Sequence, residues 1–144
     1  SIMAEFKLDQ YLPYQMSVLA RRLSQGFEEV YRKKYGLSVA DWRVLVHLHD
    51  AGSCSVREIS LQADLEKSRV SRAVARLEAR SLVTKTEHAG DKRLLQLTLS
   101  DTGHEVVSEI LPLAEEYEAQ VLSGLSDAPT FRALVDELLQ GGDD

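Results

Sequence analysis

Apolar residues recur at three- and four-residue steps in the first third of the chain, the spacing of helices that bury one face. The first stripe predicts a helix over 13–34, which Gly36 would end. A second helix is expected over 39–50. It follows Ser38, whose hydroxyl can accept from the Asp41 amide while the Asp41 carboxylate accepts from the Ser38 amide. This pair predicts a capping box.

The middle of the chain carries shorter elements. Residues 57–63 and 67–80 are predicted to form helices separated by a three-residue turn. Residues 83–88 and 94–99 are rich in β-branched and apolar side chains, and the hinge at 88–93 has turn chemistry. We therefore expect two helices joined by a tight turn and followed by a two-stranded hairpin.

Helical periodicity returns at the C-terminal end. Ser100 is expected to cap a helix that reaches about residue 123, and a last amphipathic helix starts near Asp127. The predicted fold class is mainly α with a β-hairpin wing, in a single domain over 1–144. The order short helix, turn, longer helix and hairpin is that of a winged helix-turn-helix.

The helix predicted over 67–80 has two unlike faces. Projected at about 100° per residue, Val70, Val74 and Leu77 fall on one side, and the opposite side is basic with small hydroxyls. Arginine can bind guanine through two hydrogen bonds, and serine can serve a base or a phosphate. The residues expected to contact DNA are Lys67, Ser68, Arg69, Ser71, Arg72 and Arg76. The alternative is a solvated helix face, although such faces usually mix the two charges.

The tip of the predicted hairpin carries Asp91, Lys92 and Arg93. The two cations lie where a wing reaches the minor groove and its phosphates, and Asp91 is expected to orient Arg93 through a charge-assisted hydrogen bond. The alternative is a charged loop that only faces solvent.

A net charge of −6 argues at first against a nucleic-acid partner. The distribution of charge reverses this interpretation. Residues 51–100 carry a net charge of +3 and residues 101–144 a net charge of −10. Such asymmetry suits a DNA-binding face on an acidic body.

Three segments together resemble the MarR family of transcriptional regulators. They are LSVADWRVL at 37–45, SRVSRAVARLE at 68–78 and GDKR at 90–93. The resemblance implies a homodimer in which residues 37–100 form the DNA-binding lobe. It also implies a helical dimerisation platform from residues 8–35 and 101–141.

The same resemblance implies control by a small, often aromatic, acid that binds between platform and lobe. Candidate residues for this effector site are Tyr11, Tyr14, Arg21, Arg22, Trp42 and His47. They would supply an aromatic lining and a cation for a carboxylate. The alternative is structural: Trp42 would pack in the core or an interface, the two tyrosines would anchor the dimer, and His47 would be a helix residue without a ligand.

Other function classes find less support. Cys54 is the single cysteine and is expected to be a buried, inert thiol, so an oxidant-responsive or metal-responsive regulator is only an alternative. We expect no cofactor and no metal site. The sequence contains no phosphate-cradling loop and no nucleophile motif, so it gives no indication of an enzyme. A winged helix that binds protein is the other alternative.

The sequence predicts no membrane segment, and we expect a cytoplasmic location.

Overall fold

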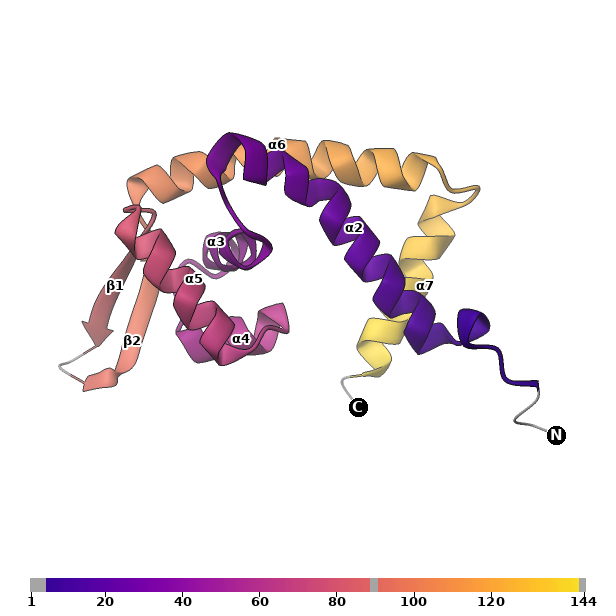
Figure 1. Ribbon diagram of the computed structural model, residues 1–144, viewed down its shortest axis with the longest axis horizontal. Coiled ribbons are helices and arrows are strands. Elements are labelled where there is room, and N and C mark those ends of the chain that lie inside the picture. Colours follow the sequence, from indigo (N-terminus) through magenta and orange to yellow (C-terminus); the bar gives the residue numbers. More distant parts are fainter. Residues whose placement is uncertain (1–4, 89–90, 143–144) are drawn as a thin grey trace. The chain divides into compact units, whose positions relative to one another are not determined.

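The computed structural model describes residues 5–88 and 91–142, with side chains described for 5–87 and 95–142. Figure 1 shows the elements. They are the 3-10 helix η1 (Leu8–Gln10), the helices α2 (Leu12–Tyr35), α3 (Val39–Ala51), α4 (Val56–Ala63), α5 (Lys67–Ala79), α6 (Asp101–Ser123) and α7 (Ala128–Gly141), and the strands β1 (Val83–His88) and β2 (Asp91–Leu99). The predicted, mainly helical fold with a two-stranded wing is confirmed. The sequence prediction contains no counterpart of η1, and β2 begins three residues earlier than predicted.

The junction between α2 and α3 is built as the sequence predicts. Gly36 has a left-handed backbone (φ +66°), and its N–H donates to the carbonyl of Arg32 at 2.9 Å. The Ser38 hydroxyl accepts from the Asp41 amide at 3.1 Å, and the Asp41 carboxylate accepts from the Ser38 amide at 3.0 Å. Because Gly36 tolerates this conformation, the chain stops one helix and starts the next within three residues.

The turn between α4 and α5 forms the helix-turn-helix. Asp64 ends α4 in a left-handed conformation (φ 52°). The Ser60 hydroxyl donates to the Leu65 carbonyl at 2.6 Å, and the Leu65 N–H donates to the Ser60 carbonyl at 3.2 Å. Leu65 is buried, so the turn is fixed by both polar and apolar contacts.

The core lies among α3, α4, α5, the hairpin and the first part of α6. The predicted packing face of α5 is confirmed, because Val70, Val74 and Leu77 are each at most 1% exposed. Other buried members are Val44, Leu45, Leu48, Ile59, Leu97, Leu99, Val107 and Ile110. A firmly buried inner face fixes which side of α5 is left for solvent or DNA.

The hairpin is antiparallel, with Val83 opposite Leu99 and a register irregularity between Thr86 and His88. Cys54 forms an isolated antiparallel β-bridge with Leu97 of β2. Its N–H donates to the Leu97 carbonyl at 3.2 Å and its carbonyl accepts from the Leu97 N–H at 2.9 Å. The base of the wing is therefore tied to the start of the helix-turn-helix.

The chain divides into two compact units, residues 1–110 and 111–144, with the boundary inside α6. In the second unit the Asp127 carboxylate caps α7 by accepting from the amide of Thr130 at 3.2 Å. Large apolar side chains of α7 are exposed, among them Leu134, Leu138 and Leu139. Among the described residues, no helix has the length and apolar character needed to cross a membrane.

Candidate nucleic-acid interface

The exposed face of the N-terminal half of α5 carries the residues that the sequence predicts for DNA. Lys67, Ser68, Arg69, Ser71 and Arg72 are all exposed. Within the described part of the chain, none of these five side chains forms an ion pair or a side-chain hydrogen bond. The hydrogen-bond donors of these side chains are therefore available to another molecule. The opposite face of α5 is buried in the core.

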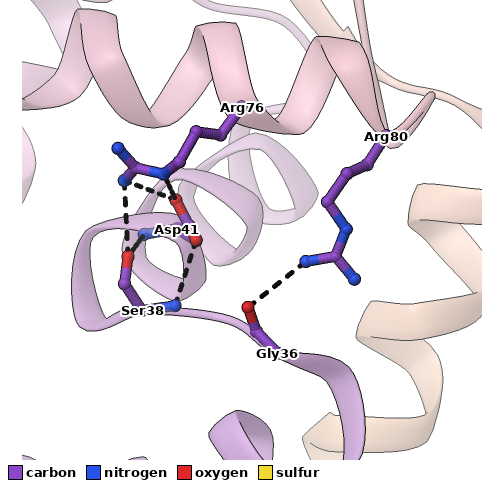
Figure 2. A network of polar contacts seen from close by, with 5 residues as sticks. All are labelled: Gly36, Ser38, Asp41, Arg76 and Arg80. Atoms are coloured by element: carbon purple, nitrogen blue, oxygen red, sulfur yellow. Dashed lines mark hydrogen bonds and ion pairs between the residues drawn. The ribbon is translucent and has the colours of Figure 1, made fainter.

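Arg76, one turn further along α5, is placed differently. Its Nε and Nη2 donate to Oδ1 of Asp41 at 3.2 Å and 2.8 Å, as Figure 2 shows. Asp41 is buried, and about half of the Arg76 side chain is exposed. Helix periodicity predicts that Arg76 faces DNA, because it lies on the same stripe as Arg69 and Arg72. The ion pair depends on how α3 crosses α5, and helical spacing alone carries no signal for that.

Arg80 follows α5 and also turns toward the protein. Its Nη2 donates to the Tyr35 carbonyl at 2.6 Å and its Nη1 to the Gly36 carbonyl at 3.3 Å. These carbonyls end α2, where a cation is favoured by the helix dipole. The Tyr35 hydroxyl in turn donates to Glu109 of α6. Burial, the hydrogen bond and the charge of Glu109 raise the pKa of Tyr35 to about 12.

The wing candidates lie outside the described side chains. Asp91, Lys92 and Arg93 fall at the start of β2, and only their backbone is described, with Asp91 opposite His88. Within β1, Nζ of Lys85 forms an ion pair with Oε1 of Glu78 on α5 at 3.6 Å. The expected roles of the three wing residues therefore remain predictions from the sequence.

An open pocket of about 290 Å³ lies where α2, α3 and the start of α5 meet. It is lined by Ala20, Arg21, Ser24, Gln25, Glu28, Val39, Arg43 and Arg69. Three arginines against one glutamate give this pocket an excess of positive charge. Of the three, only Arg21 was a predicted effector residue. Arg43 and Arg69 line the same pocket, although nothing in the sequence indicates that α3 and α5 meet there.

The six predicted effector residues do not share one site. Trp42, which is half-buried, stacks on the buried ring of Tyr31 (ring centroids 5.7 Å apart) and packs edge-on against the buried ring of Phe27. The structural interpretation of Trp42 therefore fits its position. The remaining predicted effector residues lie at separate places. Tyr11 packs on Phe6, whereas Tyr14 and Arg22 line a second open pocket of about 550 Å³. His47 is half-buried on α3.

Cys54 is buried against β2, and burial, with a smaller effect of the Glu58 charge, raises the pKa of its thiol. Little reactive thiolate is expected near neutral pH. Among residues 5–88 and 91–142, no group of three or more metal-ligating side chains lies together.

A helix-turn-helix whose second helix presents unpaired basic side chains, followed by a β-hairpin, defines a winged helix-turn-helix DNA-binding protein. A model of the MarR family matches residues 35–94. The regulator BilQ of Clostridioides difficile (strain CD3) is 26% identical over 93% of this chain and 90% of its own length. The repressor IacR of Pseudomonas putida is 27% identical over 89% of this chain and 76% of its own length.

Solved structures give the same result. A MarR/EmrR regulator from Acinetobacter sp. ADP1 matches 96% of this chain and 99% of its own, with a TM-score of 0.82 and 29% identity. Bordetella bronchiseptica BpsR, whose DNA binding is regulated by 6-hydroxynicotinic acid, matches 96% of this chain and 97% of its own, with a TM-score of 0.80 and 24% identity. The chain is therefore similar to regulators of the MarR family over nearly its whole length, and it is a helix-turn-helix transcriptional regulator.

Proposed function

We propose that the protein is a repressor that binds a palindromic operator as a homodimer and is released by a small aromatic acid. The observation that carries the DNA-binding role is the N-terminal half of α5, where exposed basic side chains have no partner within the described chain. Lys67, Ser68, Arg69, Ser71 and Arg72 are assigned to the major groove. Lys92 and Arg93 are assigned to the wing contact, with Asp91 orienting Arg93.

The DNA assignments are tested by two variants that separate base from phosphate contacts. Arg72→Ala is expected to relax the choice at one base position by roughly 1–3 kcal/mol, because a bidentate contact to guanine is lost. Arg93→Ala is expected to weaken binding to all sequences equally. Competition with single-base operator variants measures both. Equal loss on every operator variant for Arg72→Ala would reduce it to a phosphate contact.

A protein-binding winged helix would behave differently in the same assay. Phosphate contacts release counterions, so operator binding is expected to weaken steeply as salt rises from about 50 to 200 mM. Affinity that is independent of salt and equal for operator and random DNA would reject the DNA-binding role and favour a protein partner.

The homodimer proposal rests on apolar surface that each unit leaves exposed. Near the N-terminus Leu8, Leu12 and Met16 are at least 40% exposed, and α7 exposes Leu134 and Leu138. Exposed stripes of this kind mark interaction surfaces, and twofold homodimers are the commonest oligomers. We assign residues 8–35 and 101–141 to the dimerisation platform. Light scattering at micromolar concentration is expected to give twice the mass of the chain.

The effector proposal rests on the pocket formed by Arg21, Arg43 and Arg69. A carboxylate held there would receive charge-assisted hydrogen bonds from guanidinium groups. Regulation of BpsR by 6-hydroxynicotinic acid, a heteroaromatic acid, supports an effector of that chemical class. Because Arg69 belongs both to this pocket and to the DNA-facing side of α5, a bound acid would draw one donor away from DNA.

Calorimetric titration of 6-hydroxynicotinic acid, benzoates and cinnamates, with and without operator, tests this coupling. Coupling between sites usually amounts to about 1–3 kcal/mol, or 5- to 150-fold in affinity, and DNA must weaken acid binding by the same factor. Arg43→Ala is expected to remove acid binding and retain operator binding, whereas Arg22→Ala, in the second pocket, serves as the control. Acids that bind without changing operator affinity would refute the effector role.

A further inference from the structure

The arginines on and just after α5, the proposed DNA-reading helix, divide into two groups, and the change falls between Arg72 and Arg76, about one turn apart. Arg69 and Arg72 have no partner in the described chain, whereas Arg76 and Arg80 are bound to the segment that joins α2 to α3. Figure 2 shows Arg76 directed at Asp41 and Ser38, and Arg80 directed at Gly36. The basic stripe of α5 therefore has two different roles along its length.

The contact between Arg76 and Asp41 satisfies a buried carboxylate. The Asp41 side chain is 6% exposed. Its Oδ2 accepts from the Ser38 amide at 3.0 Å, and its Oδ1 accepts twice from Arg76. Arg76 Nη2 also lies 3.5 Å from the Ser38 hydroxyl. Since a buried charge without a partner is costly, this geometry holds Arg76 on the protein.

Arg80 makes a second attachment one turn later. It donates to the carbonyls of Tyr35 and Gly36, at the end of α2. Arg76 binds the start of α3, and Arg80 binds the end of α2. The C-terminal part of the reading helix is therefore fixed at both sides of a junction of only three residues, Gly36 to Ser38.

We propose that Arg76 and Arg80 are positioning residues that set the direction of the DNA-reading half of α5 relative to α2. This inference rests on the proposed DNA-reading role of α5. In a dimer held by platform helices, the angle between α2 and α5 sets the distance between the two reading helices, and the half-site spacing of the operator requires a matching distance. Arg76 then contributes to operator recognition without contacting DNA.

The competing explanation is a phosphate contact from the exposed part of the Arg76 side chain. Three variants separate the two roles: Arg76→Ala, Asp41→Asn and the double variant. Positioning predicts that both single variants weaken operator binding, by roughly two- to thirtyfold. It also predicts that the double variant is no weaker than the worse single variant, since both changes break one contact. The dependence of affinity on salt is expected to stay at the wild-type slope.

A phosphate contact predicts the opposite pattern. Arg76→Ala would then lower the salt slope by about one, and Asp41→Asn would leave affinity unchanged or increase it by freeing the guanidinium. Either result would overturn the positioning role. Arg76→Lys controls for the possibility that Arg76→Ala fails to fold, because lysine retains a cation beside Asp41. Lysine cannot reproduce the two hydrogen bonds from Nε and Nη2 of the arginine. A folded Arg76→Lys protein, checked by circular dichroism, is expected to show intermediate operator affinity, and wild-type affinity would overturn the proposal.

Operators with altered half-site spacing provide a second readout. Arg76→Ala is expected to lose its preference for the natural spacing, whereas Arg72→Ala is expected to retain that preference while losing affinity. Retained spacing preference in Arg76→Ala would overturn the positioning role. An Arg72→Ala protein that binds like the wild type would instead reject the DNA-reading role of α5, so the two failures are distinguishable.

Discussion

Gly103, in the first turn of α6, lies directly against the backbone of Leu82. A Cβ atom at this position would be 2.1 Å from the Leu82 carbonyl oxygen, which also accepts from the Ser100 amide at 3.0 Å. Because backbone cannot rotate away as a side chain can, we expect Gly103→Ala to destabilise the fold by about 1–3 kcal/mol or more. Urea denaturation measures the change. Gly141→Ala is the control, since open space surrounds that position, and equal stability of both variants would contradict the close packing.

Cys54 provides a residue-scale test of the oxidant-responsive alternative. Because burial raises the pKa of its thiol, the reactive thiolate is scarce near neutral pH and increases only as the pH rises toward that raised pKa. We expect slow labelling by iodoacetamide in the native protein and fast labelling in denaturant. Rapid native labelling at pH 7 would restore a redox role for this thiol.

At the scale of elements, α4 begins with a capping box that was not among the predictions from the sequence. The Ser55 hydroxyl accepts from the Glu58 amide at 3.2 Å, and the Glu58 carboxylate accepts from the Ser55 amide at 3.1 Å. Ser55→Ala is expected to cost about 0.5–2 kcal/mol in the free energy of unfolding. Chemical denaturation measures this cost. Ser108→Ala, at an exposed position inside α6, is the matched control, and equal stability of the two variants would argue against the cap.

Signals within a few residues of sequence predicted most of the elements. Gly36, the Ser38–Asp41 pair and the apolar stripe of α5 all act locally, and the structure confirms each of them. The same logic applied to Ser55 and Glu58 would have started α4 at Val56 rather than at residue 57.

Contacts between distant segments could not be predicted in this way. The ion pair of Asp41 with Arg76 and the stacking of Trp42 on Tyr31 depend on how helices cross, and one sequence carries no direct signal for crossing angles. The exposure of the α5 face from Lys67 to Arg72 could be predicted, because helix periodicity decides it. The pocket could not be predicted, because its three arginines come from three different helices.

For the whole molecule, the exposed apolar side chains of α7 are predicted to hold the dimer together. Leu138 is 63% exposed and follows Leu134 by one turn. Leu138→Glu would place a charge in an apolar interface, and we expect light scattering to show a monomer or a strongly weakened dimer. Leu61→Glu is the control, because Leu61 is 74% exposed on α4, within the DNA-binding lobe. A dimer that survives Leu138→Glu unchanged would exclude α7 from the interface.

The attachment of Arg80 to the end of α2 limits how this protein can be recombined with others. Gly36 looks like a natural joint for grafting the DNA-binding lobe onto a foreign platform. A cut there would separate the Arg80 guanidinium from the Tyr35 carbonyl and the Trp42 ring from Tyr31. A transplantable module must therefore begin before Tyr31, so that the last turn of α2 stays together with the helices that it contacts.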